Sequence, residues 1–316
     1  MQNVIALLPS KLSYALYYKA QRHWGALRSP NHLLGLHIGI ETWQQLVSSG
    51  YDPRQKTFFE VGTGRKPITP LAFWLMGAER VYTLDVNPYL SEELTIEAVM
   101  QISSRPDEVI NMMGDFINER RLKSLIEFCS NGTFDLTEFL AFACIECYAP
   151  ADAAHTTLPD GAIDVHTSYT VFEHIPAPII RDIMTEAHRL LNRGGVAVHL
   201  IDYTDHFCHK DSSIHWLNFL RYSDQSCKVL FGNRYMYMNR LRHDDQLAIG
   251  QAAGFSPVTL QTELDRKVPE DIANGTIKLA PRFRAKSLDV LSIVNAWVLY
   301  RPDFGPSSST KTASTP

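Results

Sequence analysis

The sequence predicts an α/β fold in which helices cover both faces of a mostly parallel sheet. From residue 57 onward, short apolar runs alternate with longer amphipathic segments, as strands alternate with helices in such folds. The first run leads directly into the turn Gly62-Thr63-Gly64, and Asp85 closes the second run. Repeated strand–helix–strand units imply right-handed crossovers between parallel strands.

The first 50 residues precede this alternation and have helical periodicity. One apolar face recurs at three- and four-residue spacing and comprises Leu36, Ile40, Trp43 and Val47. Gly50 can end this helix. Further upstream, tyrosines and Trp24 are mixed with basic residues, which is typical of an amphipathic helix on the core and also of a cleft cover or a dimer face. We therefore expect residues 1–50 to form a helical cap.

The alternating region predicts several elements in order. The clearest strands are expected over residues 57–61, 81–84, 163–168 and 196–201. Between the first two, Thr69 can cap a helix that has Pro70 at its first position and ends at Gly77. One apolar face over residues 179–191 predicts a later helix, which Gly194-Gly195 would stop.

Three segments are longer than a minimal fold of this type needs. Residues 88–147 read as a helical insertion, residues 204–237 are rich in aromatics and histidines, and residues 265–289 separate the last two strands. Long connections in compact domains are usually lids or binding elements, so we expect a lid over residues 204–237. The Ser/Thr/Pro-rich tail, residues 303–316, is expected to be disordered.

Composition narrows the class of protein. Hydrophobic residues make up 45% of the chain and the formal net charge is −4, so a large core is available and neither nucleic acid nor an anionic membrane is a favoured partner. No apolar run approaches the ~18 residues of a spanning helix, and the start lacks signal-peptide features. Five irregularly spaced cysteines suggest no disulfide framework, and Cys144 and Cys147 read as buried structural thiols. We expect a soluble cytoplasmic protein.

Glu60, Gly62, Thr63 and Gly64 stand where an open α/β sheet opens its ligand crevice. Two glycines let the backbone turn tightly and approach a ligand without an intervening Cβ. Dinucleotide dehydrogenases have a similar loop, but the third glycine of their motif would fall at Pro67. Asp85, at the end of the next strand, suits hydrogen bonds to ribose hydroxyls, and a solvated turn aspartate is the alternative.

A more specific resemblance lies further along the chain. The run 163–168, preceded by Leu158-Pro159-Asp160-Gly161 and followed by Val171-Phe172-Glu173-His174-Ile175, resembles the fourth-strand motif of class I S-adenosylmethionine-dependent methyltransferases. The helix after it, with Asn192-Arg193-Gly194-Gly195, resembles that family's next motif. The resemblance covers about residues 57–203, and residues 238–302 supply the last helix and two strands. Several motifs in the expected order are far more specific than any one alone.

The resemblance implies a Rossmann-like fold with a seven-stranded sheet, residues 51–302 as the methyltransferase domain, and S-adenosylmethionine as cofactor. At matching positions it implies that Glu60, Gly62, Thr63 and Gly64 hold the methionine portion and that Asp85 holds the ribose. It also implies that Asp152 and Ala153 contact the adenine, and that Ser168 and Tyr169 lie beside the reactive methyl group.

A narrower resemblance concerns the acceptor. The run Asp85-Val86-Asn87-Pro88-Tyr89-Leu90 and the segment 205–223 resemble uncharacterised bacterial methyltransferases associated with polysaccharide and natural-product biosynthesis. This resemblance implies O-methylation of a small-molecule sugar or natural product, by a chain that could form a homodimer. An N-methyltransferase and a non-catalytic S-adenosylmethionine-binding protein remain alternatives, and Pro67 disfavours a dehydrogenase.

Histidines near the strand ends are candidate general bases, because imidazole titrates near neutral pH. They are His206 and His209 after the fifth strand and His174 after the fourth. A polar histidine in a hydrogen-bonded lid is the alternative for each. The lid histidines, with Cys208 and Asp211, lack tight metal-ligand spacing, so no metal site is expected there.

Overall fold

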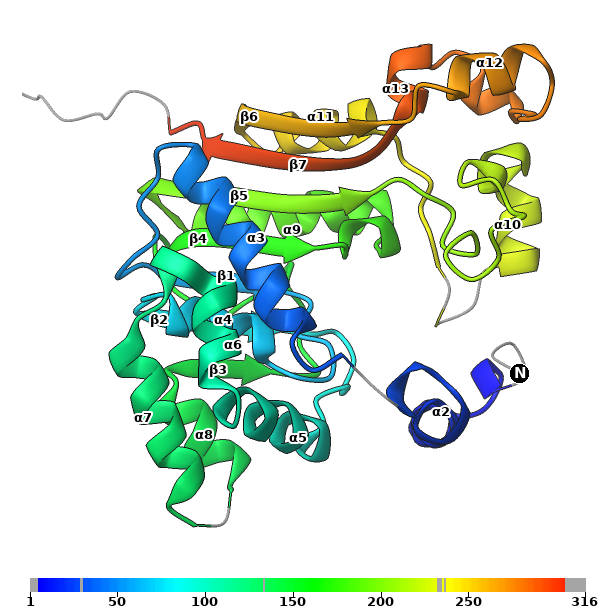
Figure 1. Ribbon diagram of the computed structural model, residues 1–316. Coiled ribbons are helices and arrows are strands. Elements are labelled where there is room, and N and C mark those ends of the chain that lie inside the picture. Colours follow the sequence, from blue (N-terminus) through cyan, green and yellow to red (C-terminus); the bar gives the residue numbers. More distant parts are fainter. Residues whose placement is uncertain (1–4, 29–30, 133, 232–234, 236, 305–316) are drawn as a thin grey trace, which may run out of the picture.

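The computed structural model describes residues 5–28, 31–132, 134–231, 235 and 237–304. A seven-stranded sheet forms its centre, in the order β3-β2-β1-β4-β5-β7-β6, with helices on both faces (Figure 1). The first five strands pair in parallel, and β7 runs antiparallel to both β5 and β6. The α/β fold with a mostly parallel sheet is therefore confirmed.

The strands are β1 (Thr57–Val61), β2 (Arg80–Leu84), β3 (Ile145–Tyr148), β4 (Ile163–Tyr169), β5 (Leu191–Asp202), β6 (Phe255–Leu264) and β7 (Ile293–Pro302). The helices of the first half are α2 (Ser10–Trp24), α3 (Leu34–Ser48), α4 (Ile68–Leu75), α5 (Glu92–Ser103), α6 (Pro106–Met113), α7 (Glu119–Ser130) and α8 (Leu136–Phe142). Those of the second half are α9 (Ala177–Leu190), α10 (Asp224–Phe231), α11 (His243–Ala252), α12 (Val268–Ala273) and α13 (Leu288–Ser292).

Two apolar cores lie on opposite faces of the sheet. Neighbouring residues of a strand point to opposite faces, so Phe58 joins the core under α3 to α8 while Phe59 joins the core under α9 and α11. Both phenylalanines are fully buried. A strand buried on both faces carries consecutive apolar residues, as β1 does at Phe58 and Phe59.

A third, smaller core joins two distant segments of the chain. Leu217, Phe219 and Leu220, from the predicted lid, pack against residues of the segment that follows β6, namely Val268, Ile277, Ala280, Phe283 and Leu291. The Ala280 N–H donates to the carbonyl of Leu220 at 2.9 Å. The two segments lie beyond the same end of the sheet (Figure 1).

Several local expectations need correction. Helix α4 begins at Ile68 after Pro67, so Thr69 does not cap it. The pair Gly194-Gly195 lies inside β5 rather than ending a helix. Glycine is needed at position 195 because a Cβ there would meet the Asp164 carbonyl oxygen of the neighbouring strand at 2.8 Å. Val47 is exposed.

The thiol expectation is also partly wrong, since Cys144 is exposed at the turn into β3 and Cys147 is half-buried. Residues 88–147 are helical as expected except for β3 at their end. Residues 305–316, the predicted tail, lie outside the described residues. Within the described ranges, no helix combines the length and apolarity that a membrane span requires.

Candidate functional site

The glycine loop after β1 is tied to the end of β2. The N–H groups of Gly62 and Thr63 donate to the carbonyl of Leu84, at 2.7 and 3.2 Å. The Asp85 carboxylate accepts from the Gly64 N–H at 2.9 Å and from the Asn87 N–H at 2.8 Å. Burial raises the pKa of Asp85, and these two N–H groups oppose that shift. The loop and the carboxylate thus form one hydrogen-bonded unit at the carboxyl edge of the sheet.

Glu60 is a buried carboxylate directly behind this loop. It accepts a 2.6 Å hydrogen bond from the Thr83 hydroxyl, which also lies 2.6 Å from the Thr63 hydroxyl. Burial raises the pKa of Glu60 to about 8, and the nearby charge of Asp85 acts in the same direction. A carboxyl of this kind is stabilised in its charged form by a cation placed against it.

A cavity of about 180 Å³ opens in front of Glu60. Its walls include Gly62, Thr63 and Tyr169, and α3 closes it from above with Leu34 and Ile38. The backbone of Gly62 has φ of +100°, and a Cβ there would lie 2.6 Å from Val171 Cγ2. Both facts explain why glycine is needed at this point, where the loop after β4 comes closest.

The other residues that the resemblance assigns to the cofactor lie along the same edge. The Ala151 N–H donates to the Asp85 carbonyl at 2.9 Å, which brings Asp152 and Ala153 beside the end of β2. Ala153 is buried, whereas the Asp152 carboxylate is exposed and accepts from the Ala154 N–H at 2.9 Å.

Ser168 and Tyr169 end β4 in different environments. Ser168 is fully buried, and its hydroxyl lies 2.8 Å from His199 Nδ1, so its side chain does not line the cavity. Tyr169 does line the cavity, and its hydroxyl donates to Glu41 Oε2 at 2.8 Å. Of this pair, only Tyr169 offers its side chain to a ligand in the cavity.

The three candidate bases lie together, as their positions after adjacent strands predicted. The ring centroids of His174 and His206 are 4.8 Å apart, and those of His206 and His209 are 5.2 Å apart. His206 Nε2 is 3.2 Å from Asp202 Oδ2, and His209 Nε2 is 3.8 Å from the same oxygen. His209 Nε2 also lies 3.1 Å from the Thr204 hydroxyl.

His174 is oriented by the backbone. Its Nδ1 lies 2.9 Å from the Tyr237 carbonyl, which can only accept, so Nδ1 carries the proton and Nε2 has a free lone pair. Burial is the largest influence on its pKa and lowers it. His215, the remaining lid histidine, approaches Asp271 of α12 at 3.5 Å instead.

Two acidic residues of this cluster were not predicted as site residues. Asp202 ends β5 as Asp85 ends β2, and that parallel was available in the sequence. Burial raises the pKa of Asp202, but hydrogen bonds involving His206 and Thr204 outweigh it and leave the pKa below its usual value. Glu173 precedes His174 and is buried, and burial raises its pKa well above the usual range.

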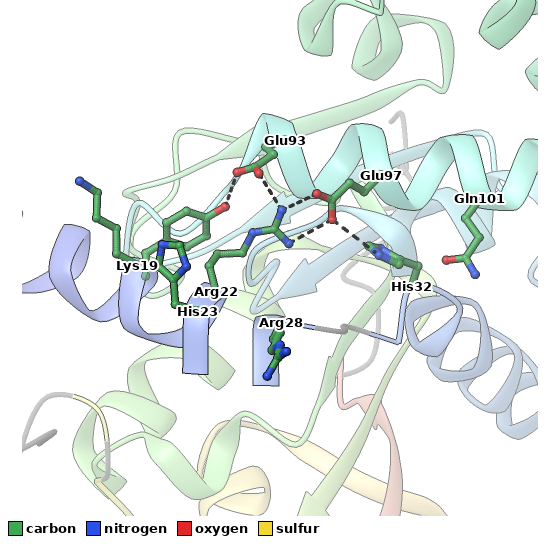
Figure 2. Close-up of a pocket in the computed structure, with 9 residues that line it drawn as sticks. Lys19, Arg22, His23, Arg28, His32, Glu93, Glu97 and Gln101 are labelled. Carbon is green, nitrogen blue, oxygen red and sulfur yellow. Dashed lines mark hydrogen bonds and ion pairs between the residues drawn. The ribbon is translucent and has the colours of Figure 1, made fainter. Parts of the chain in front are cut away.

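Helix α2 lies beside α5, clear of the sheet (Figure 1). The Tyr14 hydroxyl donates to Asn87 Oδ1 at 2.6 Å, while Tyr17 stacks on Tyr235 with ring centroids 4.2 Å apart. Arg22 binds both Glu93 and Glu97 of α5 (Figure 2). The helix thus joins the loop after β2 to residue 235 of the lid.

A second, more open cavity of about 780 Å³ lies between α2 and α5 (Figure 2). Arg22 projects into it between the two glutamates, and Tyr18 donates to Glu93 Oε2 at 2.8 Å. None of the predicted site residues lines it. Although it is larger than the cavity at Glu60, Arg22 is already paired there with both glutamates, which fits a role in seating α2.

Residues 135–199, from α8 to β5, match a family model described as a methyltransferase domain. This stretch carries the fourth-strand motif, in a chain whose sheet has the seven strands that the resemblance implied. The chain therefore carries a methyltransferase domain, on a sheet with the strand number that the class I resemblance implied. Its cofactor is S-adenosylmethionine, and the buried Glu60 carboxylate behind a glycine-lined cavity fits the cationic methionine portion of that molecule.

Similar folds occur among solved structures. The PH0226 protein of Pyrococcus horikoshii OT3 is 12% identical, with 91% of this chain and 99% of that chain covered at a TM-score of 0.48. An S-adenosylmethionine-dependent methyltransferase of Mesorhizobium loti is 13% identical, with 84% and 99% covered at 0.42. The [4+2]-cyclase SpnF is 14% identical, with 85% and 82% covered at 0.44. No curated protein sequence matches significantly. At such low identity, these likenesses do not indicate the acceptor.

Proposed function

We propose that this methyltransferase acts on a hydroxyl group of a small molecule, such as a sugar or a natural product, with the histidine cluster as its base. The observation that carries the proposal is the gathering of His174, His206 and His209 at the sheet edge that holds the glycine loop. A neutral hydroxyl is a poor nucleophile, so O-methylation benefits from a proton acceptor near neutrality. An amine acceptor would have less need of this cluster.

We place the cofactor along the carboxyl edge of the sheet. Glu60, Gly62, Thr63 and Gly64 would hold the methionine portion, and Asp85 would accept hydrogen bonds from the ribose hydroxyls. Asp152 and Ala153 would border the adenine, and Tyr169 would border the reactive centre, whereas the buried Ser168 side chain would not. When bound, S-adenosylmethionine supplies a methyl group on a positively charged sulfur.

The protein's own contribution is then alignment and proton removal. Val171, whose side chain touches the glycine loop, lies three residues before His174, so the loop after β4 connects the two halves of the site. A histidine ring nitrogen accepts the hydroxyl proton, and Asp202 stabilises the resulting positive charge on His206 at 3.2 Å. Alignment supplies the remainder of the rate enhancement.

The acceptor would bind under two covers that lie beyond the edge, α2 and the segment 204–237. In this arrangement residues 1–50 serve as a cap, and the lid is the part that distinguishes one acceptor from another. Support comes from the contact of Tyr17 with Tyr235, which brings the two covers together. Loops carried on a rigid sheet are the usual location of specificity.

Ligand binding tests the proposal first. We expect S-adenosylmethionine and S-adenosylhomocysteine to bind with micromolar affinity, and NAD not to bind, because Pro67 replaces the third glycine of the dinucleotide motif. Isothermal titration with the three ligands measures this directly. Turnover is then followed with panels of hydroxyl and amine acceptors. Methylation confined to amines would contradict the O-methyltransferase assignment without affecting the cofactor assignment.

Cofactor binding should release a proton from Glu60. With a pKa of about 8, the free carboxyl is largely protonated at pH 7. The cationic ligand lowers that pKa, so binding should release up to about one proton, and affinity should strengthen as pH rises toward 8. Titrations in buffers of different ionisation enthalpy count the protons. Glu60→Gln, which keeps the shape, should release none. Equal proton release by both proteins would remove Glu60 from the site.

A further inference from the structure

The cluster after β4 and β5 has a second property that a proton acceptor does not require. One ligand atom each from Glu173, His174 and His206 lies within 4.8 Å of the other two. Two imidazoles and one carboxylate that bind the same face of the ion are a typical donor set for a divalent transition metal. Protein ligands stand about 2.0–2.2 Å from such an ion, so adjacent ligand atoms lie about 3–3.5 Å apart. Side-chain adjustments of about 1 Å would bring these three together.

Glu173 is the more informative member of the set. Only 5% of the residue is exposed, and neither of its carboxylate oxygens has a hydrogen-bond partner among the described residues. Two backbone N–H groups, those of Glu173 and Asp202, lie near the carboxylate and partly oppose the rise of the Glu173 pKa. Neither is placed well enough to form a hydrogen bond with it. Buried carboxylates are normally paired or bound to a metal, and a cation placed against this side chain would stabilise its charged form.

The surroundings hold the three ligands in place. Asn239 Nδ2 donates to the carbonyls of Phe172 and Ile175, at 2.6 and 2.7 Å, and so clamps the turn that carries Glu173 and His174. The Tyr237 carbonyl fixes His174 with Nε2 free, which is the usual outer support of a metal-binding imidazole. Asp202 lies beside His206 as a second carboxylate.

We propose that Glu173, His174 and His206 bind one divalent transition-metal ion, with Asp202 supporting His206. The expectation of no metal rested on the lid residues alone, whereas this ligand set takes two of its members from the loop after β4. The role of the ion rests on the proposed function: open coordination positions would hold the acceptor oxygen and favour its deprotonated form. His209, outside the ligand set, is then the histidine free to take the proton.

Metal binding can be measured without turnover. The purified full-length protein is stripped with a chelator and titrated with Mn²⁺, and free Mn²⁺ is followed by electron paramagnetic resonance. We expect one ion per chain, a thermal midpoint raised by Mn²⁺ or Zn²⁺, and a smaller effect of Mg²⁺. Glu173→Gln and His206→Ala should each weaken Mn²⁺ binding at least about tenfold. His215→Ala, which changes a lid histidine outside the cluster, should bind as the parent does.

The outcomes separate this inference from the proposed function. No stoichiometric binding by the parent, or equal binding by the parent and both ligand variants, would overturn the metal site and leave the methyltransferase proposal intact. Binding that is lost in the ligand variants, in a protein that methylates only amines, would keep the metal site and remove the hydroxyl acceptor. If Glu173→Gln does not fold, His206→Ala, which changes a half-buried surface ring, decides the question.

Discussion

Gly62→Val is expected to abolish binding of S-adenosylmethionine, raising Kd by at least about 100-fold, which corresponds to about 2.7 kcal/mol. The first added atom would already lie 2.6 Å from Val171 Cγ2, and the backbone φ of +100° is strained for any residue with a Cβ. Gly62 also lines the cavity in front of Glu60, so any shift of this backbone would change the shape of the cavity. Calorimetric titration of the folded variant gives the change in Kd.

Gly50→Ala provides the matched control for that experiment. Gly50 has φ of +79°, but no atom lies within 4 Å of an added Cβ, and the residue stands outside the cavity. It should lose about 1–2 kcal/mol of folding stability and bind the cofactor normally. If Gly62→Val also binds normally with its fold intact, the cofactor does not lie against this loop.

Replacing the histidine that accepts the proton should lower kcat by about 10²–10⁴-fold and leave cofactor affinity nearly unchanged. We expect the largest losses with His206→Ala and His209→Ala, and a smaller one with His174→Ala, since acceptor-specific groups belong on variable loops such as the lid. Steady-state kinetics with a hydroxyl acceptor, together with cofactor titration of each variant, separate chemistry from binding.

His188→Ala is a suitable comparison because that ring packs against Phe255 and Phe304 at the other end of β5. It should leave kcat close to that of the parent. Turnover within a few fold of the parent in all three cluster variants would exclude base catalysis by histidine. Alignment alone would then account for the reaction.

The sheet could be predicted because its signals are local. Apolar runs, the glycine turn and Asp85 each depend on a few neighbouring residues, and β1, β2 and β4 lie within one residue of their predicted limits. The predictions were wrong where contacts between distant residues determine the local structure. Gly194-Gly195 looked like a helix end, yet the pair lies in β5, where close packing against the neighbouring strand leaves no room for a Cβ at Gly195.

Only part of the candidate site could be predicted, because only some of its contacts have local signals in the sequence. The approach of His174 to His206 follows from two adjacent parallel strands that end at one edge of the sheet, as expected for consecutive strands of this fold. The burial of Glu173 could not be read from its position next to a polar histidine, because it depends on how the turn after β4 is covered. The contact of Tyr17 with Tyr235 joins residues more than two hundred positions apart, without any local signal.

The third, small core joins residues 217–220 to the segment after β6. This packing limits how the acceptor preference can change, in evolution or by design. A lid transplanted alone from a relative would bring apolar side chains that do not fit against Val268, Phe283 and Leu291. Apolar surface would then be exposed to solvent on both the lid and the segment after β6. The two segments are therefore a matched pair, to be exchanged together, although β6 and α11 separate them along the chain. Chimeras that move both at once offer the most direct route to altered specificity on this sheet.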